Sequence, residues 1–216
     1  MSHDHGDGAD HAHAMGPTAD ASVRTAKPTD APAVGVVQAA VWTQAFAGRL
    51  PEEVVALFEA PAFAKAWRQS LESPPEGVHR LLVARAGEQV VGFAAIGPSQ
   101  DPDTGQACGE VTAIGVHPGA RRMGHGSRLL NACVDTLRGF GAEDLATWVL
   151  ADDESTRAFL VDSGLGPDGA YRDRVVSPDG DTLREVRLVA SLALEDSDVD
   201  GTEPEGTEPE GTETAE

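Results

Sequence analysis

Between residues 110 and 126 the chain passes from a strand-like period to a glycine-rich turn and then into a helical period. Apolar side chains alternate along Glu110–Val116, and Glu110 is the one charged residue of this predicted strand. Pro118, two arginines and two glycines follow, and a helix is predicted over 124–140. A strand that feeds a helix through such a turn is typical of an α/β domain, because the helix carries the chain back to the sheet.

The turn has the chemistry of an anion site. Backbone N–H groups at the start of a helix favour a phosphate, and glycines let the ligand approach the backbone closely. Arg121 and Arg122 add charged hydrogen-bond donors. Two other phosphate loops fit poorly, since Ser127 follows Gly126 where a P-loop needs lysine, and Leu129 stands where a dinucleotide fingerprint needs its third glycine.

The flanking sequence alternates between helical and strand-like segments. Two strand patterns separated by Ala-Gly-Glu predict a hairpin, and residues 97–107 and 164–170 are expected to be loops. The result is a mixed α/β domain of about six or seven strands. The other strands are expected at 22–26, 80–85, 89–96, 145–150, 171–176 and 183–190, and the other helices at about 29–46, from 51, from 61, and over 152–163.

Charge and composition divide the chain into three parts. Of 36 acidic residues, ten lie in 195–216 and four in 1–22, and neither end carries a basic residue. We therefore expect a disordered His/Asp/Gly-rich tail over 1–21, a domain over 22–194 and a disordered acidic GTEPE-repeat tail over 195–216. The net charge of −20 argues against a nucleic acid or an anionic membrane as partner.

The cysteines and the apolar runs exclude further classes of protein. Two cysteines without a C-x-x-C pair exclude a disulfide framework and a thiolate zinc site. No apolar run approaches the roughly 20 residues that span a bilayer. We expect a cytoplasmic protein.

The turn resembles the acyl-CoA-binding motif of the GNAT superfamily of N-acetyltransferases. In that motif a strand ends in V-x-P and is followed by R/Q-x-x-G-x-G/A. The second family pattern, N-x-x-A-x-x-F-Y and then G-F, is matched in part, and the order of elements over 22–190 also agrees. The matching residues are Val116-His117-Pro118, Arg121-Arg122-Met123-Gly124-His125-Gly126, Asp153, Phe159-Leu160 and Gly164-Leu165.

This resemblance implies a fold, a co-substrate and a reaction. The sheet would be mixed and mostly antiparallel, with six to seven strands flanked by helices and a splayed strand pair at the acyl-CoA site. An acetyl group would pass directly from acetyl-CoA to an amine, with no metal, and a homodimer is possible. The residues implied at the cofactor site are Ile114, Val116, Arg121, Arg122, Met123, Gly124, His125, Gly126, Ser127, Asp153 and Phe159.

Two residues receive roles in the chemistry itself. The resemblance implies that the backbone N–H of Val116 stabilises the oxyanion of the thioester carbonyl. Glu110 is the candidate general base, because partial burial would raise the pKa of its carboxyl toward a useful range. The alternative reading of Glu110 is a solvated residue at the start of a strand.

The departures from the family pattern leave a second function open. Leu160 stands where the family often has a tyrosine that protonates the leaving thiolate, and Tyr171 is the only tyrosine of the chain. Asp153 replaces the family asparagine and is expected to cap a helix, while His125 is expected to be partly exposed. The alternatives are a non-catalytic acyl-CoA-binding regulator and a metal-binding protein built on the N-terminal histidines. The acceptor amine is not readable from the sequence.

Overall fold

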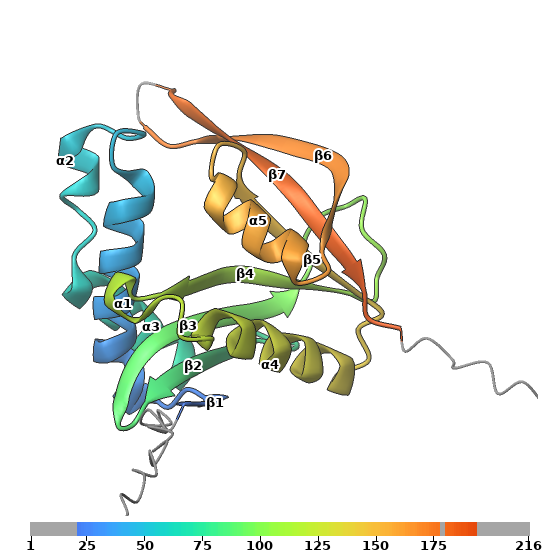
Figure 1. Cartoon of the computed structure of the whole chain (residues 1–216), viewed down its shortest axis with the longest axis horizontal. Coiled ribbons are helices and arrows are strands. Elements are labelled where there is room, and N and C mark those ends of the chain that lie inside the picture. The colour runs from blue at the N-terminus through green and yellow to red at the C-terminus, as the bar shows by residue number, and fades with distance from the viewer. Residues whose placement is uncertain (1–20, 178–179, 194–216) are drawn as a thin grey trace, which may run out of the picture.

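The computed structural model describes residues 21–177 and 180–193, which fold around one seven-stranded sheet (Figure 1). The strands lie in the order β1-β2-β3-β4-β5-β7-β6, and β4–β5 is the parallel pair among otherwise antiparallel neighbours. This confirms the mixed, mostly antiparallel sheet. The strands are β1 (Ala21–Thr25), β2 (Arg80–Ala86), β3 (Gln89–Pro98), β4 (Cys108–Val116), β5 (Asp144–Leu150), β6 (Gly166–Val175) and β7 (Thr182–Ser191).

Helices cover both faces of the sheet. The helix α4 buries a stripe of side chains spaced by four residues, Leu129, Cys133 and Leu137, and α5 adds Leu160 to the same core cluster. The helices α1 and α3 pack on the opposite face over Val83 and Phe93 (Figure 1). The helices are α1 (Ala31–Phe46), α2 (Glu52–Val55), α3 (Ala60–Glu72), α4 (His125–Gly139) and α5 (Glu154–Asp162), with short 3-10 turns η1 (Pro28–Asp30) and η2 (Pro118–Ala120).

The parallel pair β4–β5 separates part-way along its length. Pairing runs from Cys108 opposite Asp144 to Val111 opposite Thr147 and ends there, although both strands continue. On its other side β4 stays paired with β3 as far as Val116, with an irregularity at Thr112. One edge of β4 is therefore open beyond Val111, which confirms the splayed pair and creates a site for an extended ligand.

The predicted segments correspond closely to the observed ones, with errors in the two predicted loops. The loop predicted over 97–107 is wrong at Gly97 and Pro98, which still pair with β4. The hairpin around Gly87-Glu88 is present, and the helix predicted over 124–140 is α4. The loop predicted over 164–170 is wrong from Gly166 onward, because Gly166 and Pro167 already pair with β7. Glycine and proline disfavour strands in general, so their presence concealed this edge strand.

The two tails predicted over 1–21 and 195–216 lie outside the described residues, except for Ala21, which is the first residue of β1. None of the helices in the described part combines the length and the apolar character that a membrane crossing requires.

Candidate active site

The loop before α4 presents a row of backbone donors. No hydrogen bond is formed by the N–H groups of residues 122–127 within the described part of the chain. The backbone reaches this arrangement through positive φ angles at Arg122 (63°) and Gly124 (79°). Six free N–H groups at the start of a fifteen-residue helix form a row of donors, which we call the cradle, that is suited to an anion because they add to the positive end of the helix dipole.

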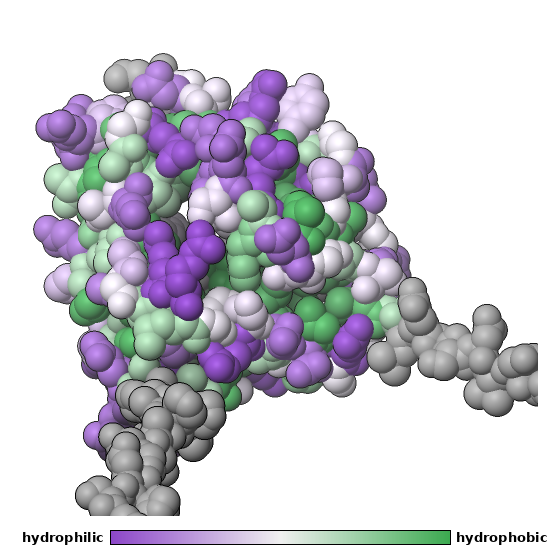
Figure 2. Space-filling view, in the orientation of Figure 1, coloured by the Kyte–Doolittle hydropathy of each residue, from purple (hydrophilic) through white to green (hydrophobic). Residues whose placement is uncertain are grey.

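Three arginines surround this cradle and remain exposed. The Arg121 Nε donates to the carbonyl of Val116 at 3.2 Å, and an Arg128 nitrogen donates to the carbonyl of Met123 at 3.0 Å. Arg122 is exposed as well. Strongly hydrophilic side chains gather over this loop in Figure 2, beside a hollow that separates the α1 side of the molecule from the α5 side. The loop is thus positively charged and open to solvent.

The start of α4 packs tightly against α5. A Cβ atom added at Gly126 would lie 3.4 Å from the Phe159 ring and 3.9 Å from the Val116 side chain. The predicted cap of α5 is present, since the Asp153 carboxylate accepts from the Thr156 N–H at 3.1 Å. Phe159 therefore packs α5 against the start of α4, and Asp153 caps α5.

The expectation for His125 is wrong. Its side chain is 2% exposed and lies on the core face of α4, one turn before Leu129. Neither ring nitrogen has a hydrogen-bond partner in the described structure. Burial, with the nearby Arg128 charge as a second cause, lowers the pKa of His125, so the ring is neutral. The His125 side chain packs in the core, and only the backbone N–H of this residue belongs to the row of free donors.

The open edge of β4 carries the groups expected to bind an extended chain. The N–H of His117 donates to Val91 on β3, and strand alternation directs the backbone of Gly115 the same way. The backbone groups of Ile114 and Val116 therefore point away from β3, toward the space where β5 has separated. The sequence-predicted pair Ile114 and Val116 thus lies on the open edge.

Glu110 lies on β4 just before the strands separate. Its side chain is on the face opposite α4, because the neighbouring Gly109 faces Leu137 of that helix. The carboxyl is partly buried and accepts a long hydrogen bond of 3.5 Å from the Ser99 hydroxyl. Desolvation by burial, and then the negative charge of Asp101, raise the pKa of Glu110, which confirms the predicted direction.

A cavity of about 410 Å³ lies on the Glu110 side of the sheet. Trp148 of β5 forms part of its wall and donates to Asp101 at 2.8 Å, and the Arg172 guanidinium stacks 4.3 Å from the Trp148 ring. Arg172 is also paired with Glu185 at 2.6 Å. The cavity is lined by Asp101, Asp103, Trp148, Gly169, Ala170, Tyr171, Arg172 and Arg187.

The segments predicted as loops over 97–107 and 164–170 contribute Asp101, Asp103, Gly169 and Ala170 to this cavity, but the sequence did not indicate the contacts among the lining residues. Asp101 and Arg172 lie in segments that read as a polar loop and a surface strand, and they meet only through the pairing of β5, β7 and β6. Trp148 is a large aromatic residue of β5. It lies two positions after Ala146, and Ala146 pairs with Glu110 in the structure.

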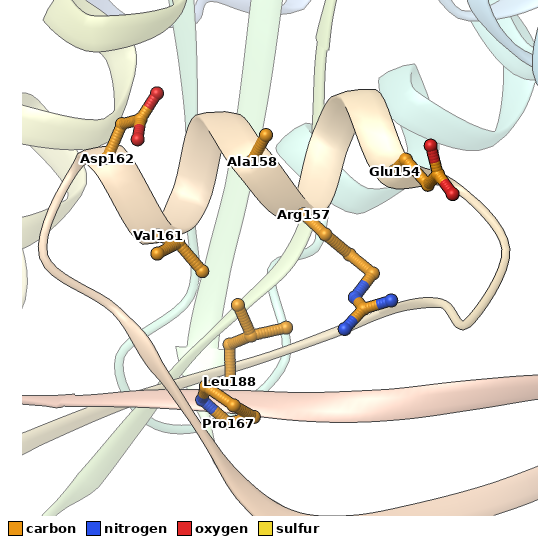
Figure 3. Close-up of a pocket in the computed structure, with 7 residues that line it drawn as sticks. All are labelled: Glu154, Arg157, Ala158, Val161, Asp162, Pro167 and Leu188. Atoms are coloured by element: carbon orange, nitrogen blue, oxygen red, sulfur yellow. The ribbon is translucent and has the colours of Figure 1, made fainter.

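A second cavity, of about 360 Å³, lies between α5 and the β6–β7 pair (Figure 3). It has a charged rim of Glu154, Arg157 and Asp162 around an apolar floor. None of its lining residues belongs to β4 or to the loop before α4, so it is separate from the cradle.

Leu160 does not reach an open site. Its side chain is 0% exposed and packs in the main core. A tyrosine introduced there would place its hydroxyl in an apolar environment, so we do not expect Leu160→Tyr to supply a proton donor. No group of three or more metal-ligating side chains is found in residues 21–177 and 180–193.

A comparison with models of known protein families identifies the family of this chain. Residues 42–165 match the model described as the acetyltransferase (GNAT) family, and this match spans more than half of the chain. The chain belongs to the GNAT acetyltransferase family. The matched region contains Glu110, the open edge of β4 and the whole loop before α4.

Individual relatives agree with this assignment. A Mycobacterium tuberculosis protein named "Probable N-acetyltransferase" is 29% identical over 152 residues, which cover 68% of this chain and 80% of that protein. The mycothiol acetyltransferase of Thermomonospora curvata is 33% identical over 117 residues, but these cover 52% of this chain and 36% of that protein. The chain thus corresponds to about a third of the mycothiol enzyme.

Solved structures share the fold. The PaiA N-acetyltransferase of Thermoplasma acidophilum, crystallised with coenzyme A, superposes with a TM-score of 0.55 at 15% sequence identity. The superposition covers 76% of this chain and 97% of that one. At this identity the likeness concerns the arrangement of helices and strands.

Proposed function

We propose that this GNAT family member transfers an acetyl group from acetyl-CoA to an amine. The observation that carries the proposal is the row of six unpartnered N–H groups over 122–127 at the end of a strand with an open edge. The coenzyme A bound to a structural neighbour of the same fold supports this choice of co-substrate. Because acetyl-CoA is made and used inside cells, a cytoplasmic location is part of the proposal.

The N–H groups of 122–127 would hold the pyrophosphate, and the exposed guanidinium groups of Arg121 and Arg122 would neutralise its charge. The Ser127 and Met123 backbones belong to the same cradle. The open-edge backbone groups of Ile114 and Val116 would pair with the pantetheine amides in the manner of an added strand.

Glu110 would accept the proton of the attacking amine, directly or through water. A strand rises about 3.3 Å per residue and the extra residue at Thr112 adds little length, so Val116 lies roughly 16 Å along β4 from Glu110, and Ile114 roughly 10 Å. The oxyanion donor must reach the thioester carbonyl, and the base must reach the amine that attacks this carbonyl. The two groups must therefore lie close to each other. We therefore infer that the Ile114 N–H is better placed than that of Val116 to face the thioester carbonyl.

The acceptor would approach on the face of the sheet that carries Glu110 and Trp148. This face is opposite α4, and the 410 Å³ cavity opens there. An amine bound in this cavity would meet the thioester from the side that the pantetheine leaves free. The sequence and the geometry leave open which amine it is, and a homodimer remains a proposal.

The alternative is a regulator that binds acetyl-CoA without turnover, because Leu160 supplies no acid for the leaving thiolate. A calorimetric titration with acetyl-CoA followed by a thiol-release assay over a panel of primary amines separates the two. Binding together with amine-dependent thiol release supports the enzyme. Binding without release from any amine supports the regulator, and absence of binding contradicts both.

A further inference from the structure

The loop between β3 and β4, residues 99–107, is fastened to the sheet by one buried arginine. The Arg187 side chain is 7% exposed and projects from β7. It donates to Asp103 at 2.8 and 2.9 Å, to Asp168 at 2.7 Å and to Asp101 at 3.4 Å. With Trp148, which donates to Asp101, these residues form what we call the Arg187 cluster.

The Arg187 cluster joins segments that are far apart in the chain. Asp101 and Asp103 come from the loop after β3, whereas Asp168 comes from the start of β6. The two-pronged contact with Asp103 uses the fork geometry of the guanidinium, which is stronger and more directional than a single hydrogen bond. These contacts together raise the pKa of Arg187 further above its ordinary value, so its charge is permanent.

The same contacts continue to Glu110. The N–H of Asp101 donates to the Ser99 hydroxyl at 3.4 Å, and that hydroxyl donates to Glu110 at 3.5 Å. The charged groups around Glu110 are Asp101 of the loop and Arg172 of β6, with Arg187 of β7 behind Asp101. The position of the loop therefore decides what surrounds the candidate base.

We propose that Arg187 is a positioning residue for acetyl transfer: it holds the loop over 99–107 against the sheet, so that Asp101 and Ser99 stand beside Glu110 and the loop forms one wall of the acceptor pocket. A surface loop of nine residues with one proline and one glycine would otherwise sample many conformations. Fixing it in advance removes that ordering cost from acceptor binding. The inference rests on the proposed function, because the pocket is an acceptor pocket only if amine acetylation occurs.

The first test measures the loop without any reaction. Asp103→Asn breaks the two-pronged contact at an exposed carboxylate, so the fold should survive. Arg184→Gln is the matched control, since it breaks the similar exposed pair with Asp173 nearer the start of β7, which makes no hydrogen bond to residues 99–107 in the described structure. Hydrogen exchange of amides 99–107 in the full-length protein should accelerate several-fold in Asp103→Asn and stay unchanged in Arg184→Gln. Equal exchange in both variants would overturn the proposal.

The second test measures turnover with an accepted amine from the panel. In Asp103→Asn, kcat/KM for the amine should fall by about 10- to 100-fold, while KM for acetyl-CoA stays constant. Asp103→Glu should recover most of the loss. Faster exchange with an unchanged kcat/KM for the amine would show that the loop takes no part in acceptor binding, and would also overturn the proposal.

The third test asks whether the cluster acts on Glu110. Asp101→Asn keeps an oxygen to accept from Trp148 but removes the charge that raises the pKa of Glu110. The acid limb of the kcat/KM profile should move to lower pH, whereas a purely structural role predicts an unmoved limb and would count against the proposal. Absence of acetyl transfer in the unmodified protein would overturn the proposed function instead, and the exchange experiment would still decide whether Arg187 holds the loop.

Discussion

At the scale of single residues, two titratable side chains near the candidate site are partly or fully buried, Glu110 and His125. Glu110 is held in an environment that disfavours its charge, and His125 is held neutral beneath the cradle. The sequence pointed to both positions, but for Glu110 it left two environments open, a partly buried carboxyl and a solvated residue at the start of a strand, and the structure has the partly buried one. The burial of His125 depends on how α4 is rotated about its axis against the sheet. The glycines on either side of His125 at the start of α4 do not indicate this rotation.

Replacing Glu110 with glutamine should separate catalysis from stability. The variant should lose about 10²-fold or more in kcat with an unchanged affinity for acetyl-CoA, because only the proton acceptor is removed. The folded-state pKa of Glu110 is raised, so its ionised form at neutral pH opposes folding, and the melting temperature of Glu110→Gln should be equal or higher. Full activity across the pH range would remove Glu110 from the mechanism.

Replacing His125 with leucine should stabilise the protein against mild acid. The folded-state pKa of His125 is lowered, so the unfolded state binds more protons once the pH falls below about 6.5, and stability declines there. His125→Leu removes two unpartnered buried nitrogens, which cost about 1–3 kcal/mol, and should flatten thermal stability between pH 7 and 5. A steeper acid loss in the variant would mean that His125 has a partner in solution.

At the scale of elements, the join between β4 and α4 is the part that the sequence described best. The spacing of Pro118, Arg121 and Gly124 predicted a strand, a turn and a helix, and these elements are present. That the turn binds an anion stays a prediction. The Arg187 cluster could not be predicted. Its members come from a loop and three strands whose pairing is long-range, and the local patterns of these segments do not indicate that the residues meet.

Gly124→Val should abolish cofactor binding at this join. The residue has a φ of 79°, and a Cβ atom there would meet the Arg128 guanidinium at 2.9 Å. Gly141→Val is a matched control after the other end of α4, with a φ of 83° and open space around it. By calorimetry, acetyl-CoA affinity should fall more than tenfold in Gly124→Val and hold in Gly141→Val, although both variants lose stability. Equal affinity in two folded variants would exclude the loop as the site.

At the scale of the whole molecule, the candidate site lies where the parallel strands β4 and β5 separate, between the two faces of the sheet. The cradle of 122–127 adjoins α5 on one face, and Glu110 with the Arg187 cluster lies on the other. The opening between β4 and β5 is where these surfaces meet, so two substrates can reach one reaction centre from opposite sides. The order of elements predicted this architecture, but not the acceptor side, because loops and edge strands diverge freely within one fold.

We propose that the domain boundaries at 22 and 194 enclose everything needed for folding and cofactor binding. A chain cut to 22–194 should melt within a few degrees of the full-length protein and bind acetyl-CoA equally well, because the composition of both ends cannot support a core. Removing 1–21 alone tests the metal-binding hypothesis for the N-terminal histidines. A large drop in melting temperature would show that an end of the chain packs against the domain.

The transfer of labelled acetyl groups tests the central claim most directly. The full-length protein is incubated with the amine panel and with acetyl-CoA that carries ¹³C in its acetyl group. The masses of the products are then measured by mass spectrometry. The account predicts that at least one amine gains a single labelled acetyl group, that Glu110→Gln forms this product about 10²-fold more slowly, and that Gly124→Val forms almost none. Labelled product at equal rates from all three proteins, or from none of them, would contradict it.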